Sequence, residues 1–194
     1  MVAIWPEFHQ LKILRLENCT FDPNETLSEI LPKMTTELQS LSLFAVMHPF
    51  RNNILPSFLA DTLEELWIEH CWPLLFEHHF ASYGKLRSLH VDWFLFAVMG
   101  PLFPQNVLSL SVSVPGYVAS SAPDFDRFEA ELEQLSVCRP SLQVVRVTGM
   151  HGLPLLGNEV KLRRNLSLQN VDMIIETVNR GKREHFFIST YIFC

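Results

Sequence analysis

The sequence predicts an α/β solenoid in which short parallel strands alternate with helices or turns and successive copies share one core. Three observations predict it: a recurring hydrophobic pattern, the regular spacing of its copies, and helical periodicity between some of them. The pattern first appears in "LKILRLENC" at residues 11–19. With 194 residues, of which 48% are hydrophobic, the chain can form about six or seven such repeats with a substantial core.

The repeat has leucine or a similar residue at its first, fourth and sixth positions. Clean copies begin at Leu11, Leu38, Leu63, Leu86, Val107 and Leu142, and a weaker copy, "RRNLSL", begins at Arg163. These starts are 27, 25, 23, 21, 35 and 21 residues apart. Alternate side chains of an extended segment face opposite ways, so one copy cannot cover its own apolar side. Copies are therefore expected to stack.

The segments between the strands are expected to be helices or turns. "TLSEILPKM" at 26–34 follows Asp22 and Asn24, either of which suits a helix N-cap. The long gap holds "PDFDRFEAELEQL", whose apolar residues fall at helical steps, and this predicts a helical insert at about 123–138. "VDMIIETVNRG" at 171–181 is interpreted as a further short helix that ends near Gly181.

Two regions follow from this pattern. Residues 1–172 are predicted to form the repeat array, and residues 173–194 a C-terminal cap made of the last helix and the strand-like "HFFISTYIFC". An array needs its ends covered, which the apolar C-terminal segment would do.

Composition excludes several classes of function. The net charge of −6 argues against nucleic-acid binding, which needs a basic surface. The longest apolar run, residues 93–103, is too short to span a bilayer and is interpreted as buried core. The four cysteines form no C-x-x-C pair, and the N-terminus does not resemble a secretory signal. An intracellular protein of the cytoplasm or nucleus is therefore expected, with no membrane partner.

The repeats resemble leucine-rich repeats, with a cysteine three residues after the last leucine in "LRLENC" and "LWIEHC". The longer, cysteine-containing style is similar to the repeat region of fungal F-box-like proteins, which are substrate receptors of cullin-based ubiquitin ligases. The resemblance implies a horseshoe with parallel strands on the concave face and helices and turns on the convex face. No F-box motif is present, so the resemblance places that segment upstream of Met1 or implies its loss.

The register of the repeats predicts three ladders of outward side chains, each made of equivalent strand positions. The ladders are Ile13, Ser40, Glu65, Ser88, Ser109 and Val144; Arg15, Ser42, Trp67, His90, Ser111 and Arg146; and Glu17, Phe44, Glu69, Asp92, Ser113 and Thr148. Neighbours on a ladder should lie about 4.8 Å apart. The predicted partner-binding residues on the concave face are Arg15, Glu17, Phe44, Glu65, Trp67, Glu69, His90, Asp92 and Arg146.

Trp67 is the centre of this predicted surface. It lies between Glu65 and Glu69 on its own strand, a pattern typical of an interaction hot spot for a basic or Arg-bearing protein. In the alternative reading a loop or terminal segment covers Trp67, or the register differs by one residue and every side chain faces the other way.

Metal and enzyme sites receive little support. Cys71 fills the repeat's own cysteine position, where an inward, hydrogen-bonded side chain is expected, and the adjacent His78 and His79 should diverge. A hydrolase or metal enzyme using Glu69, Asp92 and His90 is the rival from another class. No phosphate-binding, nucleophile-elbow or H-E-x-x-H motif is present, so no cofactor, metal or enzymatic activity is predicted.

The predicted function is that of a protein–protein interaction scaffold. More specifically, the resemblance implies the substrate-recognition part of an F-box-type ubiquitin ligase receptor. Ubiquitin ligase subunits would then bind only through an upstream F-box. A free-standing repeat adaptor or an immune-receptor-like fragment, without any role in ligation, is the alternative.

Overall fold

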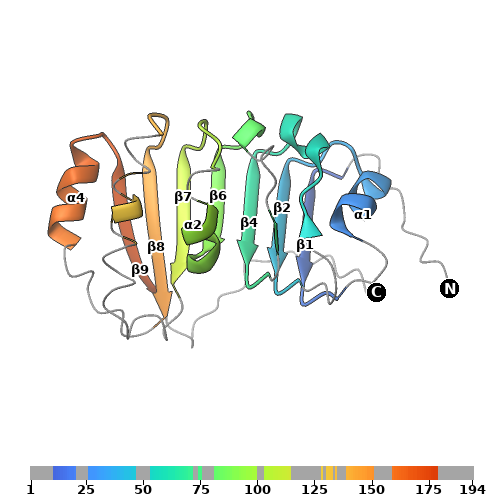
Figure 1. The fold of residues 1–194 in the computed structure, drawn as a ribbon, viewed down its shortest axis with the longest axis horizontal. Coiled ribbons are helices and arrows are strands. Elements are labelled where there is room, and N and C mark those ends of the chain that lie inside the picture. Colours follow the sequence, from blue (N-terminus) through green and yellow to red (C-terminus); the bar gives the residue numbers. More distant parts are fainter. Residues whose placement is uncertain are drawn as a thin grey trace. The chain divides into compact units, whose positions relative to one another are not determined.

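A computed structural model describes residues 11–20, 26–46, 53–71, 74–75, 81–99, 103–114, 128, 130–132, 134, 139–150 and 159–178. The chain divides into two compact units, whose helices and strands are labelled in Figure 1. Unit 1 contains residues 1–87 and 102–104, and unit 2 contains residues 88–101 and 105–194.

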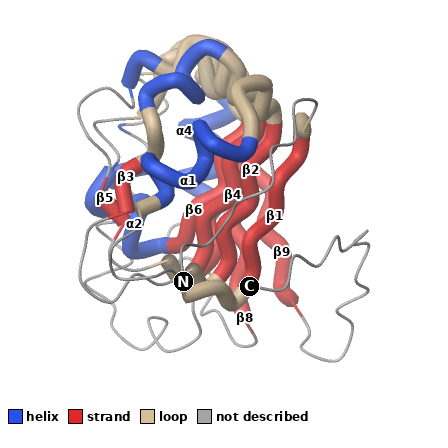
Figure 2. The backbone as a smooth tube through the Cα atoms, turned by 90° about the vertical axis from the view of Figure 1, so that its right-hand side faces the viewer, coloured by secondary structure: helices blue, strands red, loops and turns tan. Residues whose placement is uncertain are grey.

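Unit 1 is built on three parallel strands. They are β1 (Ile13–Glu17), β2 (Ser40–Phe44) and β4 (Glu65–Glu69), paired in the order β1-β2-β4. Helix α1 (Leu27–Met34) lies to one side of these strands (Figure 2). The 3-10 helix η1 (Ser57–Asp61) precedes β4, and β3 (Asn53–Ile54) pairs in parallel with β5 (Leu74–Leu75).

Helix α1 confirms the helix expected at 26–34. Its buried residues, Leu27, Ile30, Leu31 and Met34, recur at steps of three, one and three, which places them on one helical face. The N-cap is Thr26, whose N–H donates to Glu29 Oε2 at 2.8 Å. This contact satisfies one of the donors left open at a helix start. The expected caps, Asp22 and Asn24, lie outside the described residues.

Unit 2 is built on four parallel strands. They are β6 (Ser88–Asp92), β7 (Ser109–Val114), β8 (Val144–Met150) and β9 (Asp172–Val178), paired in the order β6-β7-β8-β9. Helix α2 (Trp93–Met99) follows β6 directly, and α4 (Glu159–Ser167) leads into β9.

The core of each unit is formed by the inward strand positions and the residue that opens each repeat. Of these residues, Leu41, Leu43, Leu66, Ile68, Leu89, Val91, Leu110, Val112, Val145 and Val147 expose 2% or less. Leu38, Leu63 and Leu86 are equally buried. The α/β class, the parallel strands and the helices between them are thus confirmed, and the arrangement is compatible with a solenoid-like fold. A horseshoe curvature stays a prediction.

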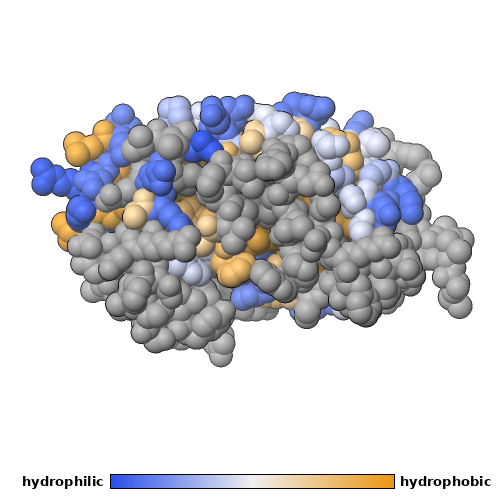
Figure 3. Space-filling model, in the orientation of Figure 1, coloured by the Kyte–Doolittle hydropathy of each residue, from blue (hydrophilic) through white to orange (hydrophobic). Residues whose placement is uncertain are grey.

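The segment "RRNLSL", expected to be a weak strand, is instead the second half of α4. Leu162 and Leu166 lie four residues apart and are both buried, as one face of a helix requires. Arg163 pairs with Glu159, one turn earlier, with 2.7 Å between Nε and Oε1. The helix also exposes Val160, and Leu168, the residue after its end, is exposed as well; hydrophobic and hydrophilic side chains mix over this region in Figure 3. Leucine spacing alone did not separate this helix from a strand.

The helix predicted at 171–181 was wrong, because its described part is strand β9. Asn170 has a φ of 58°, and this left-handed residue ends the turn after α4. Val171 and Met173 are then buried two residues apart, with the period of a strand. The strands therefore continue past residue 172, the predicted end of the array, and the proposed cap beyond Val178 lies outside the described residues.

The described residues of the predicted insert at 123–138 are helical. Phe128 is fully buried, and its ring contacts those of Trp93 and Phe96 on α2, at centroid distances of 4.5 and 5.3 Å. Within the apolar run at 93–103, Leu95, Phe96 and Phe103 are buried, as expected, but Phe94 is 50% exposed.

Candidate functional site

The strand register confirms the predicted ladders within unit 1. Ile13 pairs with Ser40 and Ser40 with Glu65; the second and third ladders have the same register. We name these nine positions the unit 1 outward face: Ile13, Arg15, Glu17, Ser40, Ser42, Phe44, Glu65, Trp67 and Glu69. Six of the nine predicted partner-binding residues lie on it.

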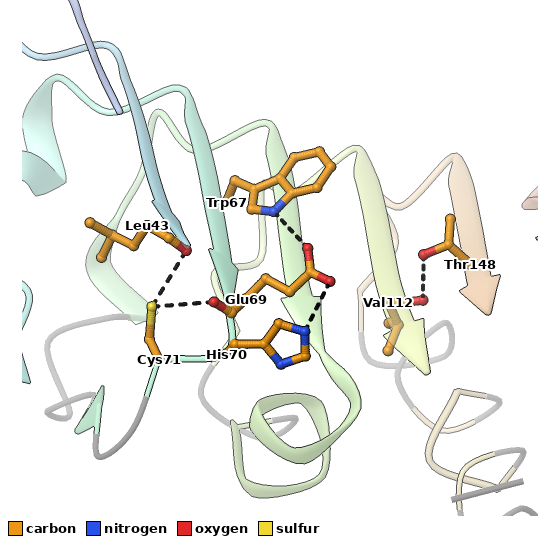
Figure 4. A network of polar contacts seen from close by, with 7 residues as sticks. All are labelled: Leu43, Trp67, Glu69, His70, Cys71, Val112 and Thr148. Atoms are coloured by element: carbon orange, nitrogen blue, oxygen red, sulfur yellow. Dashed lines mark hydrogen bonds and ion pairs between the residues drawn. The ribbon is translucent and has the colours of Figure 1, made fainter. Parts of the chain in front are cut away.

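Trp67 is the large aromatic side chain of this face. It is 45% exposed, and its indole N–H donates to Glu69 Oε2 at 3.3 Å (Figure 4). Both side chains point the same way because they lie two residues apart on β4. The contact fixes the ring while a large part of its surface stays accessible to solvent.

Glu69 has a second neighbour on the same side of β4. His70 Nε2 lies 3.7 Å from Glu69 Oε1, and the Glu69 side chain is 21% exposed (Figure 4). His70 has a φ of 55°, which ends β4 in the left-handed region. Its ring meets that of Phe44 edge to face, with 5.5 Å between centroids. Phe44, His70, Glu69 and Trp67 therefore form one continuous chain of contacts.

The remaining charged residues give this face an acidic character. Ser40 Oγ donates to Glu65 Oε2 at 3.2 Å, which orients the Glu65 carboxylate. Arg15 and Glu17 form an ion pair at 3.3 Å and offset each other. One arginine against three glutamates leaves the face negative, with Glu65 and Glu69 on either side of Trp67.

Ile13 is 69% exposed on the same face. It stands on the first ladder but was not among the predicted partner-binding residues. The signal was present in the sequence, since an apolar residue at an outward strand position is unusual in a solvated face. We include Ile13 in the candidate surface for that reason.

In unit 2 the ladders are also in the predicted register, but their chemistry differs. His90 pairs with Ser111 and Ser111 with Arg146, while Asp92 pairs with Ser113. Small residues thus occupy most outward positions of β6 and β7. Arg146 Nε lies 3.7 Å from Glu176 Oε1 on β9, and both side chains are about half exposed.

Two of the predicted unit 2 site residues have other surroundings than expected. His90 was predicted to be exposed, yet it is buried with 6% exposure. Strand alternation determines which way a side chain points, and it does not determine what packs over it. The Asp92 carboxylate accepts a hydrogen bond from the N–H of Leu95 at 2.9 Å and so caps the start of α2. This hydrogen bond occupies one of the two carboxylate oxygens.

Cys71 has the inward, hydrogen-bonded role that was predicted. It is 3% exposed, and its sulfur lies 3.4 Å from the carbonyl oxygens of both Leu43 and Glu69, either of which can accept its single S–H proton (Figure 4). The residues named for the rival enzyme or metal site fall in different units: Glu69 lies in unit 1, whereas His90 and Asp92 lie in unit 2. The Cys71 thiol also lies in unit 1.

No protein-family model, curated protein or solved structure matches this chain. Among the described helices, none has both the length and the apolar character needed to cross a membrane. The part of the chain that the structure describes holds no group of three metal-ligating side chains. Function is therefore inferred from the chemistry of the strand faces.

Proposed function

We propose that the chain is a protein-binding repeat array whose unit 1 outward face contacts a basic partner protein. The observation that carries this proposal is Trp67, which is 45% exposed and held in place by Glu69. Tryptophan is enriched in protein interfaces and among the residues that dominate their binding energy.

The fixed indole favours binding for an entropic reason. A side chain that is immobilised only on binding costs about 0.5–1.5 kcal/mol. The hydrogen bond to Glu69 supplies part of that order before a partner arrives. The partner then meets an aromatic side chain that is already oriented and flanked by carboxylates, and an unlike charge on the partner would raise both association rate and specificity.

The finer proposal is that this array recognises substrates of an F-box-type ubiquitin ligase. Its support is the resemblance of "LRLENC" and "LWIEHC" to the cysteine-containing repeats of F-box-like proteins, together with the inward thiol of Cys71. Cullin or adaptor subunits that co-purify with the natural gene product would support it. A complete coding sequence without an F-box would overturn the ligase role and leave the adaptor role.

The test compares affinity purifications from the native cell type using the wild-type chain, Trp67→Ala and Phe94→Ala. Phe94 is a matched control, since it is also an aromatic residue of about half exposure but lies on helix α2. We expect Trp67→Ala to lose captured partners, with a penalty of about 2 kcal/mol or more for a hot-spot residue. Phe94→Ala should retain them.

Circular dichroism and thermal unfolding serve to check that both variants fold. The proposal is wrong if folded Trp67→Ala retains every partner, or if both variants lose the same partners to the same extent.

A further inference from the structure

We propose that Trp67 and Glu65 form a recognition site for an arginine side chain of the partner, and that this site discriminates against lysine. The inference rests on the proposed function and adds the chemical class of the bound group. The guanidinium would lie flat on the exposed indole face while its N–H groups pair with the Glu65 carboxylate.

The two carboxylates beside Trp67 have different tasks. Glu69 accepts the indole N–H at 3.3 Å and lies 3.7 Å from His70, so it orients the ring. Glu65 is exposed and is oriented by the hydroxyl of Ser40 at 3.2 Å. Each carboxylate oxygen has two lone pairs, so Glu65 keeps acceptor capacity for a guanidinium after the contact with Ser40.

The spacing suits an arginine. Glu65 and Trp67 lie two residues apart on one face of β4, a separation of roughly 7 Å along the strand. A cation binds an aromatic face within about 6 Å of the ring centroid. A planar guanidinium can therefore stack on the ring and extend its edge toward the carboxylate.

Charge and shape select arginine over other occupants. Arginine stacks on aromatic faces and pairs with carboxylates through two parallel hydrogen bonds, whereas the lysine ammonium is a compact, strongly hydrated charge. Arg15 of the same face is already paired with Glu17 at 3.3 Å, so the chain's own arginine on this surface is engaged elsewhere.

The experiment uses the full chain with 5-fluorotryptophan in place of its four tryptophans. The fluorine spectrum reports each indole, and the Trp67→Phe variant assigns the Trp67 signal. Three serine–glycine peptides that differ only in carrying arginine, lysine or citrulline serve as probes. Citrulline has nearly the shape of arginine but no charge.

We expect the arginine peptide to shift the Trp67 signal with saturation and the lysine peptide to bind about tenfold more weakly, a difference of about 1.4 kcal/mol. Citrulline should give no saturable shift. Equal binding of arginine and citrulline, or of arginine and lysine, would overturn the assignment.

The matched variants are Glu65→Gln and Glu64→Gln, which remove the same charge. Glu64 is exposed and precedes β4, so it is not on the outward ladders. Glu65→Gln should weaken the arginine peptide about tenfold, as the loss of a charge-assisted pair predicts, and Glu64→Gln should leave it nearly unchanged. An equal loss in both variants would show general electrostatic attraction and no site at Glu65.

The two proposals fail in different ways. If Trp67→Ala loses natural partners while no arginine peptide shifts the Trp67 signal, the binding surface stands and arginine recognition is wrong. If the arginine peptide binds but Trp67→Ala keeps every natural partner, the site chemistry stands and the proposed function of the face is wrong.

Discussion

The outward faces of the two units have the same backbone register but different side chains. Unit 1 presents Trp67, Phe44 and Ile13 among carboxylates, whereas β6 and β7 of unit 2 present mainly serines. The inward residues of the central strands are nearly alike in both units: Leu41, Leu43, Leu66 and Ile68 in unit 1, and Leu89, Val91, Leu110 and Val112 in unit 2, are all buried. The inward pattern therefore carries the fold, and the outward positions are left to vary with function.

The strand ends differ as well. In unit 1, β1, β2 and β4 are each followed directly by a left-handed residue: Asn18, Ala45 and His70. In unit 2, β6 runs directly into α2, with Asp92 as the cap. Unit 1 thus places a left-handed residue directly after each of its three strands.

The largest expected effect tests whether both units depend on the same inward pattern. Leu66→Ala in unit 1 and Leu110→Ala in unit 2 should each lower the free energy of unfolding by about 3 kcal/mol, because each removes a buried side chain. Ser42→Ala and Ser111→Ala, on the outward faces, should stay within about 0.5 kcal/mol. Urea unfolding measures all four. An outward serine as costly as an inward leucine would break the comparison.

The next effect concerns the residue that follows the left-handed turn. Cys71→Ala should cost about 1–2 kcal/mol, because it removes a buried thiol and its contacts with two carbonyls. Cys19 holds the equivalent position after β1 but is partly exposed, so Cys19→Ala should cost less than about 0.5 kcal/mol. Thermal unfolding compares them. Equal losses would contradict the role assigned to burial at this position.

Tyr83 tests a tertiary contact within unit 1. It is fully buried, and its hydroxyl donates to the Pro56 carbonyl at 2.8 Å. Tyr83→Phe should cost about 1 kcal/mol, the usual net value of a hydrogen bond. A cost near zero would mean that the Pro56 carbonyl finds another donor.

The same residue has a pH signature. Burial raises the pKa of the Tyr83 phenol above its usual value of 10.0. The folded state then holds this proton more tightly than the unfolded state does. The contribution of the protonated phenol to the free energy of unfolding is therefore complete below about pH 10. Above that pH the contribution falls by about 1.4 kcal/mol per pH unit. Tyr83→Phe should lack this part of the alkaline loss in denaturant titrations at several pH values.

The smallest effect concerns the turn geometry of unit 1. Ala45 has a φ of 49°, a region in which glycine avoids the clash of a Cβ atom. Ala45→Gly should therefore stabilise the chain by about 0.5 kcal/mol, after the entropy cost of glycine is included. Ser42→Gly, in the extended part of β2, should instead destabilise it by about 0.5–1 kcal/mol. Urea midpoints measure both, and the same sign for the two would contradict the assigned turn.

The sequence by itself determined the six clean copies of the repeat, the strands that they form and the outward ladders within each unit. Leucines at fixed spacing leave one strand face to be buried, and a one-residue slip would expose them all, so the register follows from the pattern. Helix α1 was also predictable from its own segment of the sequence, and the inward thiol of Cys71 from its position in the repeat.

Tertiary structure decided the points at which local patterns are ambiguous. Leu162 and Leu166 suit a helix as well as a strand. After the left-handed Asn170, the buried Val171 and Met173 lie two residues apart, one residue fewer than the first and fourth positions of the repeat. Burial of His90 depends on neighbours that no alternation pattern specifies. Alternation places Trp67 and Glu69 on one face of β4, but it does not decide that the indole donates to the carboxylate. A pattern fixes the direction of a side chain, while packing alone decides what that side chain meets.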